Sequence, residues 1–350
     1  MPMPVVSILM PVYNAAPFLV ESINSILQQK YRDYEFLILD DASSDNSAAI
    51  IGSFADRRIR YYRNEQNLGV ALTLNKGMEL AVGTYIARMD ADDVSVSERL
   101  GCQVEFMNRH PDIGISGGQV RLFGAGLSTI ARVPLTPEEV AAYMCFENPL
   151  WHMTVIMRRS LMNANALRYN PVYTRSEDYE LWTRSIRHFP IANQKRVLVR
   201  VREHGKSASR ANWEVMTNQT EVIQQALLRC NGYHFTNEEI AFHHRVGRGY
   251  RMENRKDIVR AESWLARMCN TNQLSGAISN ESYRQVVAMV WFRLCANSGP
   301  LGPWILKKWC RSPLASRDGQ TATEVARFVA SVAWHLCRRL SGAFVAKERI

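Results

Sequence analysis

Three carboxylates stand within four residues of one another, at Asp90, Asp92 and Asp93. The preceding segment, residues 85–89, has strand character. Like charges this close repel one another and raise their own pKa values unless a cation joins them. Alternating acids with a third beside them suit a hard divalent ion that also holds phosphate oxygens. A solvated acidic turn that caps a helix from Ser97 fits the same residues, because Asp is common at helix starts.

Two further acidic pairs could take part in binding or catalysis. Asp40 and Asp41 follow an apolar run over residues 34–39, and Glu177 and Asp178 begin an expected helix. Glu177 can raise the pKa of Asp178, which moves it toward the range of a general base, or can simply hold an acceptor. Acids also favour helix caps and first helical turns, so both pairs could serve only as caps.

Alternating strands and helices must position these acids. The expected strands span residues 5–10, 34–39, 59–62 and 85–89, and the expected helices span 17–29, 48–54 and 70–81. This alternation implies right-handed crossovers and a parallel sheet. Ligands of such sheets lie outside the carboxyl ends of the strands, so the acids at 40–41 and 90–93 should face one cleft.

The remainder of the chain is mixed and then helical. Further strands are expected at 113–122, 154–157 and 197–201, and further helices at 137–146, 177–188, 214–229, 237–248, 255–268, 281–294 and 321–340. Composition and charge shift near residues 212–216. We therefore expect a catalytic domain over residues 1–214 and a basic helical region over residues 215–350.

The net charge of +10 belongs to the C-terminal part. Residues 217–350 hold 19 Lys and Arg against 10 Asp and Glu, whereas residues 1–216 hold 24 against 23. Nucleic acid, anionic lipid headgroups and phosphorylated substrates all fit such an excess. Tryptophans beside cations, in residues 304–309 and 328–339, suit an interfacial helix on an anionic membrane surface. A helical bundle with a basic solvent face fits them equally.

Seven scattered cysteines without a C-x-x-C pair favour a reducing compartment over a disulfide frame or zinc site. The N-terminus lacks a signal-peptide pattern. The sequence contains no run of about 18 apolar residues, so we expect no membrane-spanning helix. We therefore expect a cytoplasmic protein, peripheral on the inner face of the plasma membrane if its basic region binds lipid. The chain also has no G-x-G-x-x-G after its first strand and no P-loop motif. A nucleotide held without a glycine loop needs a metal on its phosphates, which the acidic cluster could supply.

Several ordered motifs carry a family resemblance. They are Ser7-x-x-Met10-Pro11-Val12-Tyr13-Asn14, Leu39-Asp40-Asp41-x-Ser43-x-Asp45, Asn67-x-Gly69, Asn75-x-Gly77, Gly83-x-Tyr85-Ile86, Asp90-Ala91-Asp92-Asp93, Glu177-Asp178-Tyr179-x-Leu181-Trp182 and Arg202-x-His204-x-x-Ser207. Over residues 5–210 the chain resembles the inverting family 2 glycosyltransferases, including bacterial cell-surface polysaccharide and lipopolysaccharide enzymes. The resemblance implies a GT-A fold, which is a Rossmann-like mixed α/β sheet flanked by helices, here followed by an α-helical C-terminal region.

The resemblance also implies a site for a nucleotide sugar, with UDP as the expected nucleotide. Its implied residues are Pro11, Tyr13, Asn14, Asp40, Asp41, Asn67 and Asp90. Tyr13 would lie against the uracil ring, and Asp41 would accept a hydrogen bond from a ring nitrogen. Asp90 would hold the ribose or the metal's shell. Asp92 and His204 would bind Mn²⁺ or Mg²⁺ on the diphosphate, although His204 could also be a merely solvated loop residue.

On the acceptor side, the resemblance makes Asp178 the general base for a hydroxyl of a glycan or lipid-linked acceptor. Glu177 and His152 would stand beside that acceptor, although a histidine such as His152 is often a hydrogen-bonded structural residue. One base without a protein nucleophile means a single displacement with inversion, assisted by the metal. The expected enzyme is a hexosyltransferase-like glycosyltransferase of polysaccharide biosynthesis.

Two other functions compete with this one. A sugar nucleotidyltransferase would need a glycine-rich, basic loop after the first strand, and residues 11–14 supply neither glycine nor cation. A non-catalytic nucleic-acid-binding protein would carry basic and aromatic residues along the cleft. The motifs there are acidic and would repel phosphate without a metal, so no nucleic acid is expected as a partner.

Overall fold

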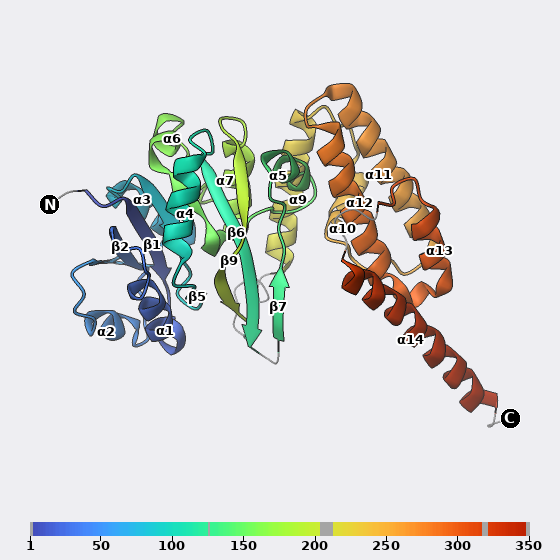
Figure 1. Ribbon diagram of the computed structural model, residues 1–350, viewed down its shortest axis with the longest axis horizontal. Coiled ribbons are helices and arrows are strands. Elements are labelled where there is room, and N and C mark those ends of the chain that lie inside the picture. Colours follow the sequence, from blue (N-terminus) through green and yellow to red (C-terminus); the bar gives the residue numbers. More distant parts are fainter. Residues whose placement is uncertain (1–2, 125–126, 204–212, 317–320, 348–350) are drawn as a thin grey trace. The chain divides into compact units, whose positions relative to one another are not determined.

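The computed structural model describes residues 3–124, 127–203, 213–316 and 321–347 (Figure 1). The chain divides into two compact units. The first consists of Met1–Val140 and Asn148–Ile223, and the second of Ala141–Glu147 and Gln224–Ile350. The functional boundary expected at residues 214/215 stays a prediction.

Four parallel strands form one half of the sheet in the first unit, in the order β3-β2-β1-β4. They are β1 (Val6–Val12), β2 (Tyr34–Asp40), β3 (Ile59–Arg63) and β4 (Tyr85–Arg88). The helices α1 (Ala16–Leu27), α2 (Ser47–Gly52) and α3 (Val70–Leu80) connect them. All residues of β2 are buried, as expected for a largely apolar strand inside a parallel sheet. The alternation predicted from the sequence is confirmed here.

The other half of the sheet continues past β4 in the order β8-β6-β9-β5, and β7 pairs with β6. These strands are β5 (Val94–Ser95), β6 (Ile115–Gly124), β7 (Leu127–Ala131), β8 (Ile156–Arg158) and β9 (Ile191–Arg202). The helical segments are α4 (Arg99–Arg109), α5 (Pro137–Met144), η1 (His152–Thr154), α6 (Arg159–Ala164) and α7 (Glu177–Ser185). Antiparallel β8 makes the sheet mixed, so the expected fold class is confirmed.

Close backbone packing explains the glycine before β4. A Cβ on Gly83 would lie 2.6 Å from the backbone nitrogen of Ser7, and 2.8 Å from the carbonyl carbon of Val6. Contacts this short with backbone atoms cannot be relieved by a side-chain rotation. The amide of Gly83 also donates a hydrogen bond of 2.8 Å to the Ser7 hydroxyl. Gly83 therefore lets β4 enter the sheet directly beside β1.

The second unit is helical. Its elements are α10 (Asn237–Gly247), α11 (Arg255–Ser275), α12 (Asn280–Asn297), η2 (Gly299–Leu301), α13 (Pro303–Arg311) and α14 (Ala322–Lys347), preceded by α9 (Trp213–Cys230), within which the division of the chain falls. Tyr283, Trp291 and Phe328 are among its fully buried side chains. Within the described ranges, none of the helices combines the length and apolar character needed to cross a membrane.

Candidate functional site

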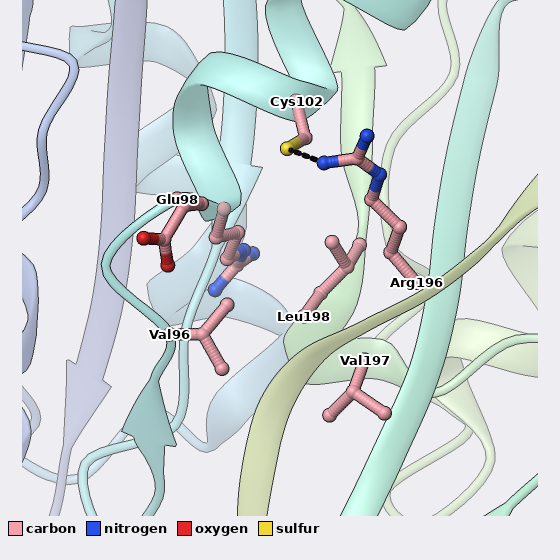
Figure 2. A pocket seen from close by; sticks show the side chains of 7 residues that line it. Val96, Glu98, Cys102, Arg196, Val197 and Leu198 are labelled. Atoms are coloured by element: carbon pink, nitrogen blue, oxygen red, sulfur yellow. Dashed lines mark hydrogen bonds between the residues drawn. The ribbon is translucent and has the colours of Figure 1, made fainter.

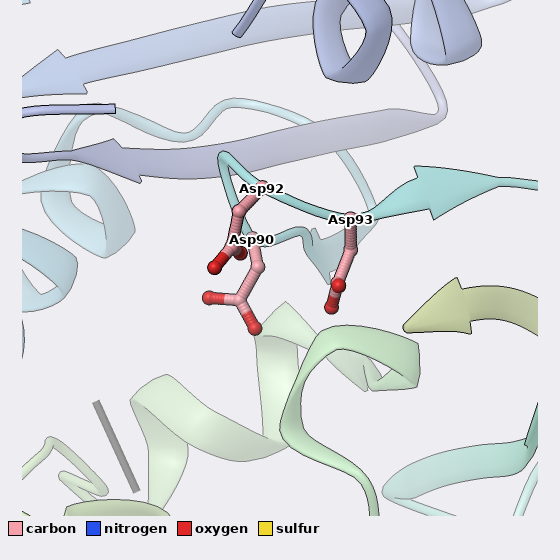
Figure 3. Close-up of side chains that lie close together, drawn as sticks. All are labelled: Asp90, Asp92 and Asp93. Carbon is pink, nitrogen blue, oxygen red and sulfur yellow. The ribbon is translucent and has the colours of Figure 1, made fainter. Parts of the chain in front are cut away.

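The acidic loop after β4 brings three carboxylates together. Oxygens of Asp90, Asp92 and Asp93 all lie within 4.8 Å of one another, and Figure 3 shows the side chains directed to the same side of the loop. Two elements fix this loop. The Ser22 hydroxyl of α1 donates to the carbonyl of Asp93 at 2.7 Å. At the end of β9, the amide of Arg202 donates to the Asp93 carboxylate at 2.8 Å, and its Nε donates to the carbonyl of Asp92 at 3.1 Å.

The electrostatics of this loop favour a bound cation. Burial, followed by the charges of Asp90 and Asp92, raises the pKa of Asp93 to about 8. Burial also raises the pKa of Asp90, although the Arg88 guanidinium opposes this shift. Carboxylate oxygens are the ligands that Mn²⁺ and Mg²⁺ prefer, and a divalent ion would relieve the repulsion. The three side chains therefore fit the expected metal site in donor type and spacing.

Two buried arginines lie under the acidic loop. Arg88, the last residue of β4, forms an ion pair with Asp90. Arg99, the first residue of α4, donates from Nη2 to the carbonyl of Arg88 at 2.6 Å and from Nε to Gln103 at 2.9 Å. Neither arginine was predicted from the sequence as a site residue. A cation in the otherwise uncharged strand 85–89 was the signal available, since buried charges are rarely unpaired.

The second pair of acids, Glu177 and Asp178, begins α7. The Asp178 carboxylate accepts hydrogen bonds from Asn148 Nδ2 at 2.8 Å and from the Tyr179 amide at 2.7 Å. Burial, and then the charge of Asp178, raises the pKa of Glu177 to about 8. Burial raises the pKa of Asp178 as well, but both hydrogen bonds favour its ionised form. Burial thus favours the neutral form of Glu177 at neutral pH, whereas the two hydrogen bonds to Asp178 favour its ionised form.

Arg88 links the two acidic groups electrostatically. Its charge acts on Asp90, on Glu177 and on Asp178, and Glu177 in turn senses the charge of Asp90. Such mutual effects between buried groups require short separations. The first unit thus brings the carboxylates of residues 90–93 and 177–178 together, although almost ninety residues separate them in the sequence.

The expected nucleotide residues lie at the carboxyl ends of β1 and β2 and in the loop after β3. Tyr13 is 55% exposed, directly after β1. Asn14 has a positive φ of 51°, and its Oδ1 accepts from the Ser44 amide at 2.8 Å. Pro11 lies near the end of β1, and Asn67 Oδ1 accepts from the Gly69 amide at 3.1 Å. An exposed ring at a strand end is available to a planar ligand.

Asp40 and Asp41 are buried and hold neighbouring loops. Asp40 accepts from the Ser43 amide and from the Tyr61 hydroxyl, both at 2.8 Å. Asp41 accepts from Asn64 Nδ2 at 2.8 Å, and from the backbone amides of residues 68 and 69 at 2.8 and 2.9 Å. The pair therefore shapes the loop of residues 64–69, and its contact with a nucleotide stays a prediction.

Of the two histidines predicted for the site, His152 lies within the described residues. His152 is only 8% exposed, and its Nε2 forms a hydrogen bond of 2.8 Å with the Tyr169 hydroxyl. Burial, and then the charge of Arg88, lowers the pKa of His152 well below its usual value, so the ring is neutral. Its Nδ1 lies 3.8 Å from Glu177. A direct contact of His152 with an acceptor stays a prediction, and His204 lies outside the described residues.

A separate hollow of about 430 Å³ lies between the start of α4 and β9 (Figure 2). It is lined by Val96, Glu98, Arg99, Cys102, Arg196, Val197 and Leu198. Arg196 Nη1 donates to the Cys102 sulfur at 2.9 Å across it. None of the carboxylates of the acidic loop lines this hollow, so we do not include it in the site.

The buried Glu177 makes stability depend on pH. Its pKa of about 8 lies above the ordinary value of 4.5, so the fold favours the neutral form and loses stability as pH rises from about 4.5 to about 8. Glu177→Gln should remove this loss, with a limit of about 5 kcal/mol. Thermal melting from pH 5 to pH 9 tests this: the advantage of the variant should grow with pH. Glu180→Gln, on the same helix, should show no such growth, and a constant advantage for Glu177→Gln would contradict the assignment.

Comparisons with known proteins find sequence relatives of this chain. Residues 7–155 match the family described as Glycosyl transferase family 2. The chain is 33% identical over 235 residues to the "Putative glycosyltransferase EpsE" of Bacillus subtilis, covering 65% of this chain and 83% of that protein. It is 32% identical over 178 residues to the "UDP-Glc:alpha-D-GlcNAc-diphosphoundecaprenol beta-1,3-glucosyltransferase WfgD" of Escherichia coli, covering 51% and 68% of the two chains.

Solved structures share the fold at low sequence identity. Staphylococcus aureus TarS 1–349 in complex with UDP-GlcNAc has a TM-score of 0.54 and 17% identity, covering 81% of this chain and 90% of that one. The mannosyltransferase PcManGT from Pyrobaculum calidifontis, in complex with GDP-Man and Mn²⁺, has a TM-score of 0.53 and 16% identity, covering 95% and 87%. These structures therefore share the arrangement of helices and strands with this chain.

Proposed function

Because the chain belongs to glycosyl transferase family 2 and is a glycosyltransferase, we propose that it transfers a sugar from a UDP-sugar to a hydroxyl of a glycan or lipid-linked acceptor. The proposed setting is the biosynthesis of a bacterial cell-surface polysaccharide, because relatives such as EpsE and WfgD bear glycosyltransferase names and WfgD acts on a diphosphoundecaprenol-linked sugar. The transfer proceeds by a single displacement with inversion.

One observation carries the proposal: Arg88 forms an ion pair with Asp90, and its charge also acts on Glu177 and Asp178, so the two acidic groups share one buried guanidinium. Asp178 accepts from two N–H donors that favour its ionised form, which suits a base that takes the proton of the acceptor hydroxyl. Asp90, Asp92 and Asp93 would hold Mn²⁺ or Mg²⁺, and the bound ion would stabilise the charge that develops on the leaving diphosphate. A neutral Glu177 adds no charge beside the base and can donate a hydrogen bond to the acceptor.

Sugar transfer and product stereochemistry test this proposal together. The purified protein is incubated with Mn²⁺, a panel of UDP- and GDP-sugars, and acceptors that include short saccharides and polyprenyl-diphosphate-linked sugars. NMR of the product then gives the anomeric configuration. An α-linked donor should give a β-linked product. An α-linked product would exclude the single displacement. If the protein consumed none of the donors, the proposed function would be rejected.

We further propose that α14 binds an anionic lipid surface. Val329, Trp334 and Leu336 are large apolar residues of α14 with 47%, 55% and 38% of their surface exposed. Arg327 and Arg338 are exposed on the same helix, and the Arg338 guanidinium lies 5.3 Å from the centre of the Trp334 ring. Exposed aromatic and aliphatic groups beside cations are typical of interfacial helices. A position at the membrane would suit an enzyme with a lipid-linked acceptor.

Flotation with vesicles of anionic phospholipid tests the lipid proposal. Binding should be present at low salt and weaken at high salt, because the attraction is largely electrostatic. The variant Arg327→Glu with Arg338→Glu should lose binding at low salt, and Lys195→Glu, an exposed cation on β9, should keep it. Sugar transfer to a soluble acceptor should be unchanged in all variants. Absence of vesicle binding by the native protein at low salt would reject the proposal.

A further inference from the structure

Arg88 has hydrogen-bonding capacity that the protein does not use. Its side chain is buried, and its charge partner is Asp90. A guanidinium carries five N–H donors. Among the described residues, Nε has no hydrogen-bond partner, and Nη1 has only the ion-pair contact with Asp90. A buried N–H without a partner costs free energy, so native proteins contain few of them, and many have a functional explanation.

The neighbouring Arg99 shows that burial alone does not produce this arrangement. Arg99 is also buried, and each of its three nitrogens has an acceptor. Nε donates to Gln103 at 2.9 Å, Nη1 contacts the Met89 sulfur at 3.2 Å, and Nη2 donates to the carbonyl of Arg88 at 2.6 Å. The unused donors of Arg88 are therefore a local property of the site.

The position of Arg88 identifies what those donors face. Its charge acts on Asp90, on the cation-binding side, and on Glu177 and Asp178, on the acceptor side. In a single displacement, the sugar carbon under attack lies between the diphosphate and the incoming hydroxyl. The transferred sugar must then occupy the space between these two acidic groups. Arg88 borders that space from the end of β4.

Resting on the proposed function, we propose that Arg88 binds the transferred sugar and contributes to its selection, by donating N–H groups to oxygens of that sugar. Nε and Nη1 are enclosed, and a turn of Asp90 toward a bound cation would open Nη1 to the sugar. The carboxylates around the site disfavour an anionic substituent, so the oxygens recognised belong to hydroxyl or amide groups. The planar fork of a guanidinium can contact two neighbouring oxygens, which a lysine ammonium cannot match.

Arg88→Lys separates sugar binding from charge compensation, because lysine keeps the positive charge beside Asp90. The test uses the nucleotide sugar that the native enzyme turns over fastest, and the matching nucleoside diphosphate, each with Mn²⁺. Dissociation constants come from calorimetry and kcat/KM from initial rates. The variant should lower kcat/KM for the nucleotide sugar by roughly 10- to 100-fold. Its dissociation constant for the nucleoside diphosphate should stay within about twofold of the native value.

Arg99→Lys is the matched control. It should lower the melting temperature, since it removes hydrogen bonds to Gln103 and to the backbone carbonyl of Arg88. It should not weaken binding of the nucleotide sugar relative to binding of the nucleoside diphosphate. If Arg88→Lys weakened the binding of both ligands equally, the only role of Arg88 would be to hold Asp90, and the proposal would be overturned. Native kcat/KM in Arg88→Lys would overturn it as well.

Deoxy analogues of the donor identify the oxygen that Arg88 contacts. With a donor that lacks one particular hydroxyl, the native enzyme should lose about as much kcat/KM as Arg88→Lys loses with the intact donor. Arg88→Lys acting on that deoxy donor should show little further loss. Fully additive losses at every position would contradict the contact. Failure of the proposed function would be distinct, because the native enzyme would then consume no nucleotide sugar.

Discussion

Asp178→Asn is expected to lower kcat for sugar transfer by about a thousandfold, within the range that general-base catalysis supplies. An amide cannot take the proton of the acceptor hydroxyl, so the attacking oxygen would have to lose it to water. The substitution keeps the shape of the side chain, and the amide oxygen can still accept from the Tyr179 amide, whereas the bond from Asn148 Nδ2 to the second oxygen is lost. A small drop in melting temperature is therefore expected, with the fold retained. Binding of the donor should also persist, since Asp178 lies on the acceptor side of the site.

Rates at saturating donor and acceptor measure this effect, together with the melting temperature and the dissociation constant of the nucleotide sugar. Glu180→Gln is the matched control, because Glu180 lies on the same helix and pairs with Arg184. This control should keep near-native kcat. If Asp178→Asn retained more than a tenth of native turnover, the base would have to be sought elsewhere, and Glu177 would be the next candidate.

The parallel half of the fold could be predicted from the sequence because its strands are continuous apolar runs. Residues 36–39 are apolar on both faces, and the structure buries all of β2, including the charged Glu35. Acids placed directly after such strands lie at the carboxyl edge of the sheet, so the acidic loop at Asp90–Asp93 was visible as a feature. The confirmed family and fold both follow from motifs in this half.

The other half depends on pairings that local patterns do not specify. Strand β8 has only three residues, yet it lies between β4 and β6 and pairs antiparallel with both, which makes the sheet mixed. Strand β9 is twelve residues long, because β6 pairs along most of its length, with a register shift between Gly118 and Gln119. Only the run at 197–201 was evident from β-branched residues.

Long-range contacts decide the details of the site. Asn148 holds Asp178 from thirty residues away, and the end of β9 holds the acidic loop through Arg202. His152 illustrates the opposite case: its sequence position suggested an accessible acceptor loop, whereas the structure encloses the ring against Tyr169. Contacts of this kind arise from the assembled sheet, which explains why residue types alone did not reveal them.

Asp92→Ala is expected to lower kcat/KM by about 100- to 1000-fold and to raise the Mn²⁺ concentration needed for half-maximal rate. Removing one of three carboxylates takes away a charged ligand of the proposed ion and weakens stabilisation of the leaving diphosphate. The fold should persist, because the loop is held through the backbone carbonyl of Asp92 and the side chain of Asp93. Direct Mn²⁺ binding, followed by electron paramagnetic resonance, provides a readout that does not depend on turnover.

Asp112→Ala makes the same chemical change at an exposed position outside the site, and it should leave both the rate and Mn²⁺ binding unchanged. A chelator should abolish native activity, and added Mn²⁺ or Mg²⁺ should restore it. Saturating Mn²⁺ should recover only part of the loss in Asp92→Ala, since the remaining carboxylates hold the ion with fewer ligands. Native turnover and native Mn²⁺ affinity in Asp92→Ala would remove the acidic loop as the metal site. The repulsion among its carboxylates would then be balanced by Arg88, by Arg99 and by the Arg202 amide.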